Sequence, residues 1–195
     1  MVQIYGCITV EGENDVSYRQ NDVLIPESSY IRFNDVQLKK YYFNDVLVWQ
    51  RQQKVYPGIP VAKTQNLGYA AYFTVTNSGS DIKVDAFGGT ERGYGRVMLG
   101  GFSTIGYSQI YFANLRAFIT NSFSHIKVAL SDINGNVVQQ LIYSEANGFD
   151  TTYTASTKFN INSPNGNYYL MLEVESGATH LGKNATILMN GCYLI

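Results

Sequence analysis

The sequence predicts an all-β protein that consists of a small N-terminal β-meander and a larger antiparallel β-sandwich. Tyr and Phe contribute 16 and 10 of the 195 residues, and Gly contributes 18. This composition favours strands and turns over helices. Apolar and polar residues alternate along much of the chain, and no segment carries the apolar stripe of an amphipathic helix. Together with the turn signals between the apolar runs, these patterns indicate many short strands.

The N-terminal part contains the motif Phe-Asn-Asp-Val twice, at residues 33–36 and 43–46. Asn and Asp tolerate the backbone angles of a tight two-residue turn, and the flanking residues are strong β-formers. We therefore expect two hairpins, separated by one strand over 36–43. Residues 1–53 are predicted to form a β-hairpin domain that docks on a partner. Its candidate docking or packing residues are Tyr41, Phe43 and Trp49.

Residues 54–63 are predicted to be a linker, because they include Tyr56-Pro57-Gly58-Ile59-Pro60. From residue 64 to 195 we expect a jelly-roll-like sandwich. Asn134-Gly135 is the strongest hairpin signal in this part. The expected strands cover residues 69–76, 82–87, 96–99, 110–119, 125–131, 137–143, 154–161, 168–175 and 185–194.

Charge and cysteine content narrow the partners and the compartment. The chain has 14 basic and 15 acidic side chains, so no net field attracts nucleic acid or an anionic membrane, and neither is an expected partner. The N-terminus lacks the basic and apolar regions of a secretory signal. We therefore expect synthesis in the cytoplasm. Cys7 and Cys192 are expected to be reduced and mostly buried, although a bridge between the two ends of the chain stays open.

Catalytic and metal-binding patterns are missing from the sequence. His125 lies in an apolar run and is expected to be structural, and His180 is expected in a loop; neither has a partner at metal-ligand spacing. Glu173 and Glu175 share a strand face, which we expect at a solvated edge, and Asp81 and Asp85 have no third partner. Residues 132–136, Asp-Ile-Asn-Gly-Asn, have oxygen ligands at alternate positions but lack the bidentate Glu of a calcium loop, and the hairpin is a sufficient explanation of them. The sequence predicts no enzyme, no cofactor and no metal.

A ligand-binding face is suggested by the alternation of Arg92, Tyr94 and Arg96. Alternate residues of a strand share a face, and aromatic rings beside planar donors suit sugar rings or carboxylates. We place Tyr107 and Tyr111 beside them as further candidates. The alternative is a solvated loop with scattered tyrosines.

Two resemblances bear on function. The segment Lys39–Trp49, Lys-Lys-Tyr-Tyr-Phe-Asn-Asp-Val-Leu-Val-Trp, resembles a segment of structural proteins of tailed bacteriophages, with Asp45 where glycine is more usual. Residues 64–195 resemble, in their strand pattern, the jelly rolls of galactose-binding-like and carbohydrate-binding modules.

Together these resemblances imply a non-enzymatic virion protein, such as a capsid decoration, head fibre or tail accessory protein. Such a protein would assemble in the host cytoplasm into the virion, contact capsid or tail subunits, and form a homo-oligomer, with a trimer as the expectation. The alternative is a carbohydrate-binding module or adhesin that recognises host-surface glycans.

Overall fold

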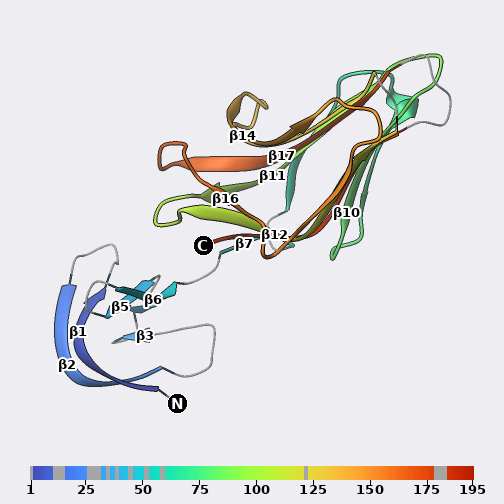
Figure 1. Cartoon of the computed structure of the whole chain (residues 1–195). Helices are drawn as coiled ribbons and strands as arrows, with labels where there is room; N and C mark the ends of the chain where they lie inside the picture. The colour runs from blue at the N-terminus through green and yellow to red at the C-terminus, as the bar shows by residue number, and fades with distance from the viewer. Residues whose placement is uncertain are drawn as a thin grey trace. The chain divides into compact units, whose positions relative to one another are not determined.

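The chain folds into two compact units, residues 1–52 and residues 53–194 (Figure 1). The computed structural model describes side chains for residues 53–57, 60–120, 123–177 and 184–195. In residues 1–50 it describes the backbone of the strands alone. Across these described parts there is no α-helix, and no helix could cross a membrane.

The N-terminal unit consists of short antiparallel strands. Phe33 pairs with Val36 and Phe43 pairs with Val46, so both Phe-Asn-Asp-Val motifs form the predicted hairpins. The expected single strand over 36–43 is instead two strands, β4 and β5, which belong to different sheets. The strands are β1 (Val2–Val10), β2 (Val16–Ile25), β3 (Arg32–Phe33), β4 (Val36–Gln37), β5 (Lys40–Phe43) and β6 (Val46–Gln50).

The docking candidates Tyr41, Phe43 and Trp49 lie in this unit. Tyr41 and Phe43 are in β5 and Trp49 is in β6. Their side chains, and that of Cys7, fall outside the described residues. Their docking or packing role therefore stays a prediction.

The C-terminal unit is a sandwich of two antiparallel sheets, which confirms the predicted all-β, jelly-roll-like class. The five-stranded sheet has the order β14-β13-β17-β11-β8, and the other sheet has the order β15-β12-β18-β10-β9, with β16 paired to β12 and β7 paired to β18. The bounds are β7 (Gln53–Tyr56), β8 (Val61–Asn66), β9 (Phe73–Asn77), β10 (Ile82–Phe87), β11 (Gly93–Ser103), β12 (Gln109–Ile119), β13 (His125–Ser131), β14 (Val137–Ser144), β15 (Asp150–Thr154), β16 (Lys158–Asn160), β17 (Asn167–Ser176) and β18 (Asn184–Leu194).

From residue 54 onward, the structure differs from the expected elements at three places. The segment expected as a linker, 54–63, contains most of β7 and the start of β8, because Val55 and Tyr56 are buried and β7 pairs with β18. The expected strand 154–161 is interrupted by a turn between β15 and β16. The start of the expected strand 69–76 is a short 3₁₀-helix, η1 (Ala70–Tyr72).

One apolar core lies between the two sheets. It combines inward side chains of both, for example Leu99 and Leu172 from one sheet and Phe112 and Ile187 from the other. Cys192 belongs to this core as a free, buried thiol, and burial raises its pKa well above the usual value. Because the core occupies the inner faces, binding sites in this unit have to lie on the outer faces or the loops.

Candidate functional site

The sandwich presents two outer faces, which differ in how their polar groups are used. The outward side chains of β14, β13, β17, β11 and β8 form what we call the five-stranded face. Those of β15, β12, β18, β10 and β9, with β16 and β7, form the seven-stranded face.

Glu173 lies at the centre of the five-stranded face and is surrounded by cations. Its register partners are Arg96 on β11 and Lys127 on β13. Lys127 Nζ lies 2.8 Å from Glu173 Oε1, His125 Nε2 lies 3.2 Å from the same oxygen, and Arg96 Nη1 lies 3.6 Å from Oε2. The Glu173 side chain is only 2% exposed. The expectation that Glu173 and Glu175 occupy a solvated edge is therefore wrong, because β17 is the middle strand of the sheet.

The ionisation of Glu173 depends on these neighbours. Burial by itself raises the pKa of a carboxyl group, since it penalises the charged form. Hydrogen bonds from His125 and Lys127, and the charges of the same two groups, outweigh burial and lower the pKa of Glu173 to about 2. Glu173 is thus a carboxylate at neutral pH, held by partners from both neighbouring strands.

The predicted residues Arg92 and Tyr94 lie on the same face, and the register pairs Tyr94 with Glu175, two residues along β17 from Glu173. Arg92 forms an ion pair with Glu175, and its guanidinium lies 4.4 Å from the centre of the Tyr94 ring. His125 Nδ1 lies 2.8 Å from Glu175 Oε2, and the His125 and Tyr94 rings meet edge to face. Arg92, Tyr94 and Arg96 thus share one face, as their alternation predicted. Both arginines, however, form ion pairs with glutamates of the same face.

The third predicted residue, Arg96, fastens the β13–β14 turn over the face. Its Nη2 donates to the carbonyl of Asn134 at 2.7 Å, its Nη1 to the carbonyl of Gly135 at 3.2 Å, and its Nε to Gln65 at 2.6 Å. Gly135 has a positive φ of 82°, and a Cβ there would collide with the Arg96 guanidinium. Asp132 accepts the backbone N–H groups of Asn134 at 2.8 Å and Asn136 at 2.9 Å, as a tight turn requires.

The predicted partners Tyr107 and Tyr111 lie elsewhere. Tyr107 packs against the core from the loop between β11 and β12. Tyr111 is on β12, in the other sheet, where its ring stacks on that of Tyr193 with centroids 5.1 Å apart. Tyr107 and Tyr111 follow Arg96 closely in the sequence but do not lie beside it, because the successive strands β11 and β12 belong to opposite sheets.

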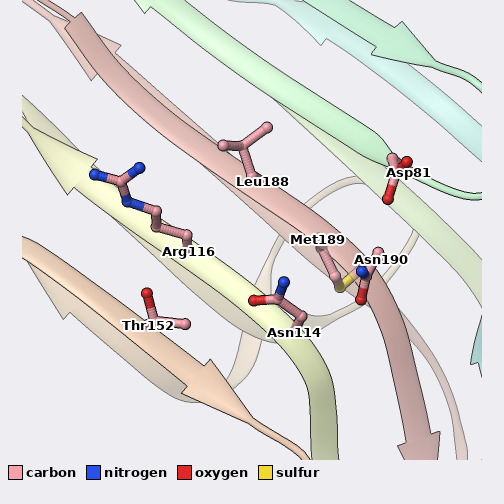
Figure 2. A pocket seen from close by; sticks show the side chains of 7 residues that line it. All are labelled: Asp81, Asn114, Arg116, Thr152, Leu188, Met189 and Asn190. Carbon is pink, nitrogen blue, oxygen red and sulfur yellow. The ribbon is translucent and has the colours of Figure 1, made fainter.

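An open pocket with a volume of about 300 Å³ lies on the seven-stranded face (Figure 2). Two successive register shifts between β12 and β18 occur there, at Phe112/Asn114 and at Asn114/Leu115. Such bulges re-aim side chains and are frequent beside functional sites. The lining residues are Asp81, Asn114, Arg116, Thr152, Leu188, Met189 and Asn190.

The polar groups of this pocket differ in whether they already have a partner. Asp81 Oδ2 accepts a hydrogen bond of 3.0 Å from the Ser80 hydroxyl. Among the described residues, the side chains of Asn114, Asn190 and Thr152 make no hydrogen bond. Arg116 is oriented by Asp150, with Nε 2.9 Å from Oδ1 and Nη2 2.6 Å from Oδ2. This pair holds the pKa of Asp150 below its usual value through the Arg116 hydrogen bond and charge. Figure 2 shows Arg116 and Asn114 on β12, beside Thr152 on β15.

No pattern in the sequence indicated these pocket residues as a site. Asn114, Arg116 and Asn190 fall inside strands that were expected, at 110–119 and 185–194. Alternation alone gives the outward position of Arg116, two residues from Asn114. Asn114 and Asn190 line the same pocket because of the register shifts between β12 and β18. No sequence pattern within either strand predicts these shifts.

A second hollow lies at the end of the five-stranded face. It is lined by Phe123, Ser124, His125, Glu145 and Glu175. Glu145 accepts a hydrogen bond of 2.7 Å from the Tyr143 hydroxyl, and Glu175 is bound as described above. The carboxylates of this hollow are therefore engaged within the protein.

No metal site is evident in the part of the chain with described side chains, where no three His, Cys, Asp or Glu residues gather as a metal would require. His180 lies outside the described residues.

No protein-family model matches the chain, and no curated protein does. Solved structures with a similar fold include a mutant of a family 29 carbohydrate-binding module, with 12% identity and a TM-score of 0.39, covering 73% of this chain and 90% of that one. Another family 29 mutant, complexed with cellulohexaose, has 11% identity, a TM-score of 0.39 and coverage of 73% and 89%.

The C-terminal family 6 module of a laminarinase from Zobellia galactanivorans has 12% identity and a TM-score of 0.40, with coverage of 73% and 98%. At such identities and TM-scores, the function has to be inferred from the residues of this chain.

Proposed function

We propose that the C-terminal unit is a non-catalytic glycan-binding domain whose site is the pocket on the seven-stranded face. The observation that carries this proposal is the group of uncommitted polar side chains around it. Asn114, Asn190 and Thr152 make no hydrogen bond within the described protein. They stand beside an oriented guanidinium, that of Arg116, and the carboxylate of Asp81.

The chemistry of this pocket matches a sugar. Each sugar hydroxyl is both a donor and an acceptor, and an amide side chain offers both functions in one plane. Arg116 adds donors and Asp81 adds acceptors. Leu188 and Met189 supply the apolar part of the lining, against which the C–H face of a sugar ring can lie. Most ligand sites combine an apolar surface with a few directed polar groups in this way.

The pocket is poorly suited to glycoside hydrolysis. That reaction uses two carboxyl groups on either side of the scissile bond, one as acid and one as base or nucleophile. Asp81 is the one carboxylate among the described lining residues. Asp150, the partner of the lining residue Arg116, is engaged in two hydrogen bonds with it. Binding without cleavage is the activity that this arrangement supports.

The test is binding of the full chain to a panel of immobilised neutral and acidic polysaccharides. Arg116→Ala is expected to weaken binding to whichever polysaccharide the wild type retains. Arg92→Ala is the matched control, because Arg92 lies on the five-stranded face and is equally exposed, at 52% against 49%. Binding that is lost in Arg92→Ala and kept in Arg116→Ala would place the site on the other face and contradict the proposal.

The virion role implied by the N-terminal segment is compatible with a glycan-binding sandwich, and it stays a prediction. Its physical basis is the pair of hairpins closed by Phe33 with Val36 and Phe43 with Val46. Light scattering of the full chain at several concentrations tests the expected oligomer, and a chain that is monomeric throughout would count against assembly through this unit.

A further inference from the structure

A row of four side chains crosses four neighbouring strands of the seven-stranded face, β7, β18, β12 and β16. The register pairs Lys54 of β7 with Tyr193 of β18, Tyr193 with Tyr111 of β12, and Tyr111 with Lys158 of β16. Residues directly opposite each other in a sheet share a face. The sheet therefore presents the order Lys-Tyr-Tyr-Lys, which we call the lysine–tyrosine row.

Contacts and burial support the outward direction of this row. The Lys54 ammonium lies 5.9 Å from the centre of the Tyr193 ring, and the Tyr111 and Tyr193 rings stack with an angle of 18°. The neighbours Val55 and Phe159 turn inward, since Val55 is in the core and Phe159 packs against it. Lys54 and Lys158 are both exposed, Tyr193 is half-buried, and Tyr111 is only 9% exposed.

The two lysines have no carboxylate partner in the part of the chain with described side chains. Among the described residues, no carboxylate forms an ion pair with Lys54 or Lys158. Other cations of this face differ, because Lys83 is paired with Asp85 at 2.7 Å and Arg116 is paired with Asp150. The row thus holds two ammonium groups without an ion-pair partner among the described residues. The Cα atoms of these two lysines lie about 14 Å apart, across three interstrand spacings.

The row is continuous with the pocket. Tyr193 is two residues from Gly191, which pairs with Asn114. A Cβ added at Gly191 would lie 3.2 Å from the Tyr193 ring, so this ring lies against the strand segment that leads to Asn190 and the pocket. A chain ligand that occupies the pocket and extends along β12 and β18 would meet the row next.

From this placement we infer that the glycan is acidic, with carboxylate or sulfate groups that meet Lys54 and Lys158. This inference rests on the proposed function of the same face and specifies its ligand class. Ammonium groups form charge-assisted hydrogen bonds with these anions, and a tyrosine ring beside them provides an apolar surface with a polar tip. A neutral glycan would offer no anionic group to the ammonium groups of Lys54 and Lys158.

The experiment compares matched polysaccharides on the full chain. Polygalacturonate and its methyl ester differ in the carboxylate alone, and a sulfated galactan and its desulfated product differ in the sulfate alone. We expect one of the two acidic forms to bind about tenfold more tightly than its neutral form at low salt, and the difference to shrink as salt screens the lysines. Which pair responds identifies the anion.

Variants assign the effect to the row. Lys54→Gln and Lys158→Gln are each expected to weaken binding of the acidic form about threefold, and the double variant about tenfold, with no change for the neutral form. Lys63→Gln on β8 of the other sheet is the matched control and should bind as the wild type does.

Several outcomes would overturn the inference. Equal binding of acidic and neutral forms would remove the need for an anion while leaving the glycan-binding proposal intact. Equally tight binding of polyuridylate would show attraction to any polyanion. Failure to bind any neutral or acidic polysaccharide would contradict the proposed function itself.

Discussion

The two outer faces of the sandwich contrast in the state of their polar side chains. On the five-stranded face, the carboxylate of Glu173 and the cations around it satisfy one another, and Arg96 is also bonded to the β13–β14 turn. On the seven-stranded face, Asn114, Asn190 and Thr152 make no hydrogen bond within the described protein. A saturated network stabilises a fold, whereas uncommitted groups on a rigid sheet can serve a ligand. The contrast distinguishes residues whose side chains bond to one another from residues that we propose bind the glycan.

The largest expected effect comes from breaking the network of the five-stranded face. Glu173→Gln removes the negative charge and leaves Lys127 and Arg96 close together without compensation. Because the carboxylate is buried, we expect a loss of about 3 kcal/mol in the free energy of unfolding, measured by urea denaturation. Polysaccharide binding at low urea should be unchanged. A loss under 1 kcal/mol would show that the network contributes little.

The same carboxylate gives the domain an acid-sensitive stability. The pKa of Glu173 is about 2 in the folded protein against an ordinary value of 4.5. Its contribution is therefore complete above pH 4.5 and is lost as the pH falls from 4.5 through 2, by about 3 kcal/mol in total. The difference in unfolding free energy between wild type and Glu173→Gln should shrink across this window. A difference that stays constant from pH 5 to 2.5 would contradict the assigned pKa.

Removing the amides of the pocket should weaken glycan binding and leave the stability of the protein unchanged, the reverse of the effect expected for Glu173→Gln. Asn114→Ala and Asn190→Ala are each expected to weaken glycan binding about fivefold, or about 1 kcal/mol, since each removes one or two hydrogen bonds to the ligand. Both are exposed and make no hydrogen bond with another described residue, so the unfolding free energy should change by less than about 0.5 kcal/mol. Isothermal titration calorimetry and urea denaturation measure the two quantities.

Gln140→Ala is the control for these amide variants. It removes an exposed amide from β14, on the five-stranded face. It should alter neither affinity nor stability. A loss of affinity in Gln140→Ala as large as in Asn114→Ala would erase the distinction between the faces.

The turn over the five-stranded face offers a smaller test of stability. Gly135→Ala places a Cβ at a φ of 82° and against the Arg96 guanidinium. We expect a loss of about 1–2 kcal/mol in unfolding free energy, with glycan binding intact. Gly148→Ala shares the positive φ of 79° but has open space around it, so it measures the backbone cost alone. Equal losses in the two variants would show that contact with Arg96 is unimportant.

The smallest expected change in stability belongs to Asp150→Asn. The ion pair between Arg116 and Asp150 is exposed, and such pairs contribute little to stability. The denaturation midpoint should therefore not move measurably. Affinity for the glycan should fall, because Arg116 loses the partner that orients it. Unchanged affinity would indicate that the orientation of Arg116 is irrelevant to binding.

The sequence predicted what depends on neighbours along the chain. Both Phe-Asn-Asp-Val hairpins and the Asn134-Gly135 turn formed as expected, because turn geometry is decided by two to four residues. The shared face of Arg92, Tyr94 and Arg96 followed from the two-residue period of a strand. The all-β class followed from the same local patterns.

What the sequence could not predict depends on strand order and register. Glu173 meets Arg96 and Lys127 because β17 lies between β11 and β13, and no local pattern encodes that order. Asn114 and Asn190 line one pocket because two register shifts occur between β12 and β18. A register shift is a property of two paired strands, so the site could not be found from either strand alone.

The most direct test of a binding site on the seven-stranded face is an NMR titration of the labelled full chain. The ligand is an oligosaccharide prepared from the polysaccharide that the wild type binds most tightly in the panel. We predict that the side-chain amide signals of Asn114 and Asn190 shift with saturation, while the backbone signals of Lys127 and Glu173 stay in place. Shifts confined to residues of β11, β13 and β17 would show that the glycan lies on the five-stranded face and would contradict this account.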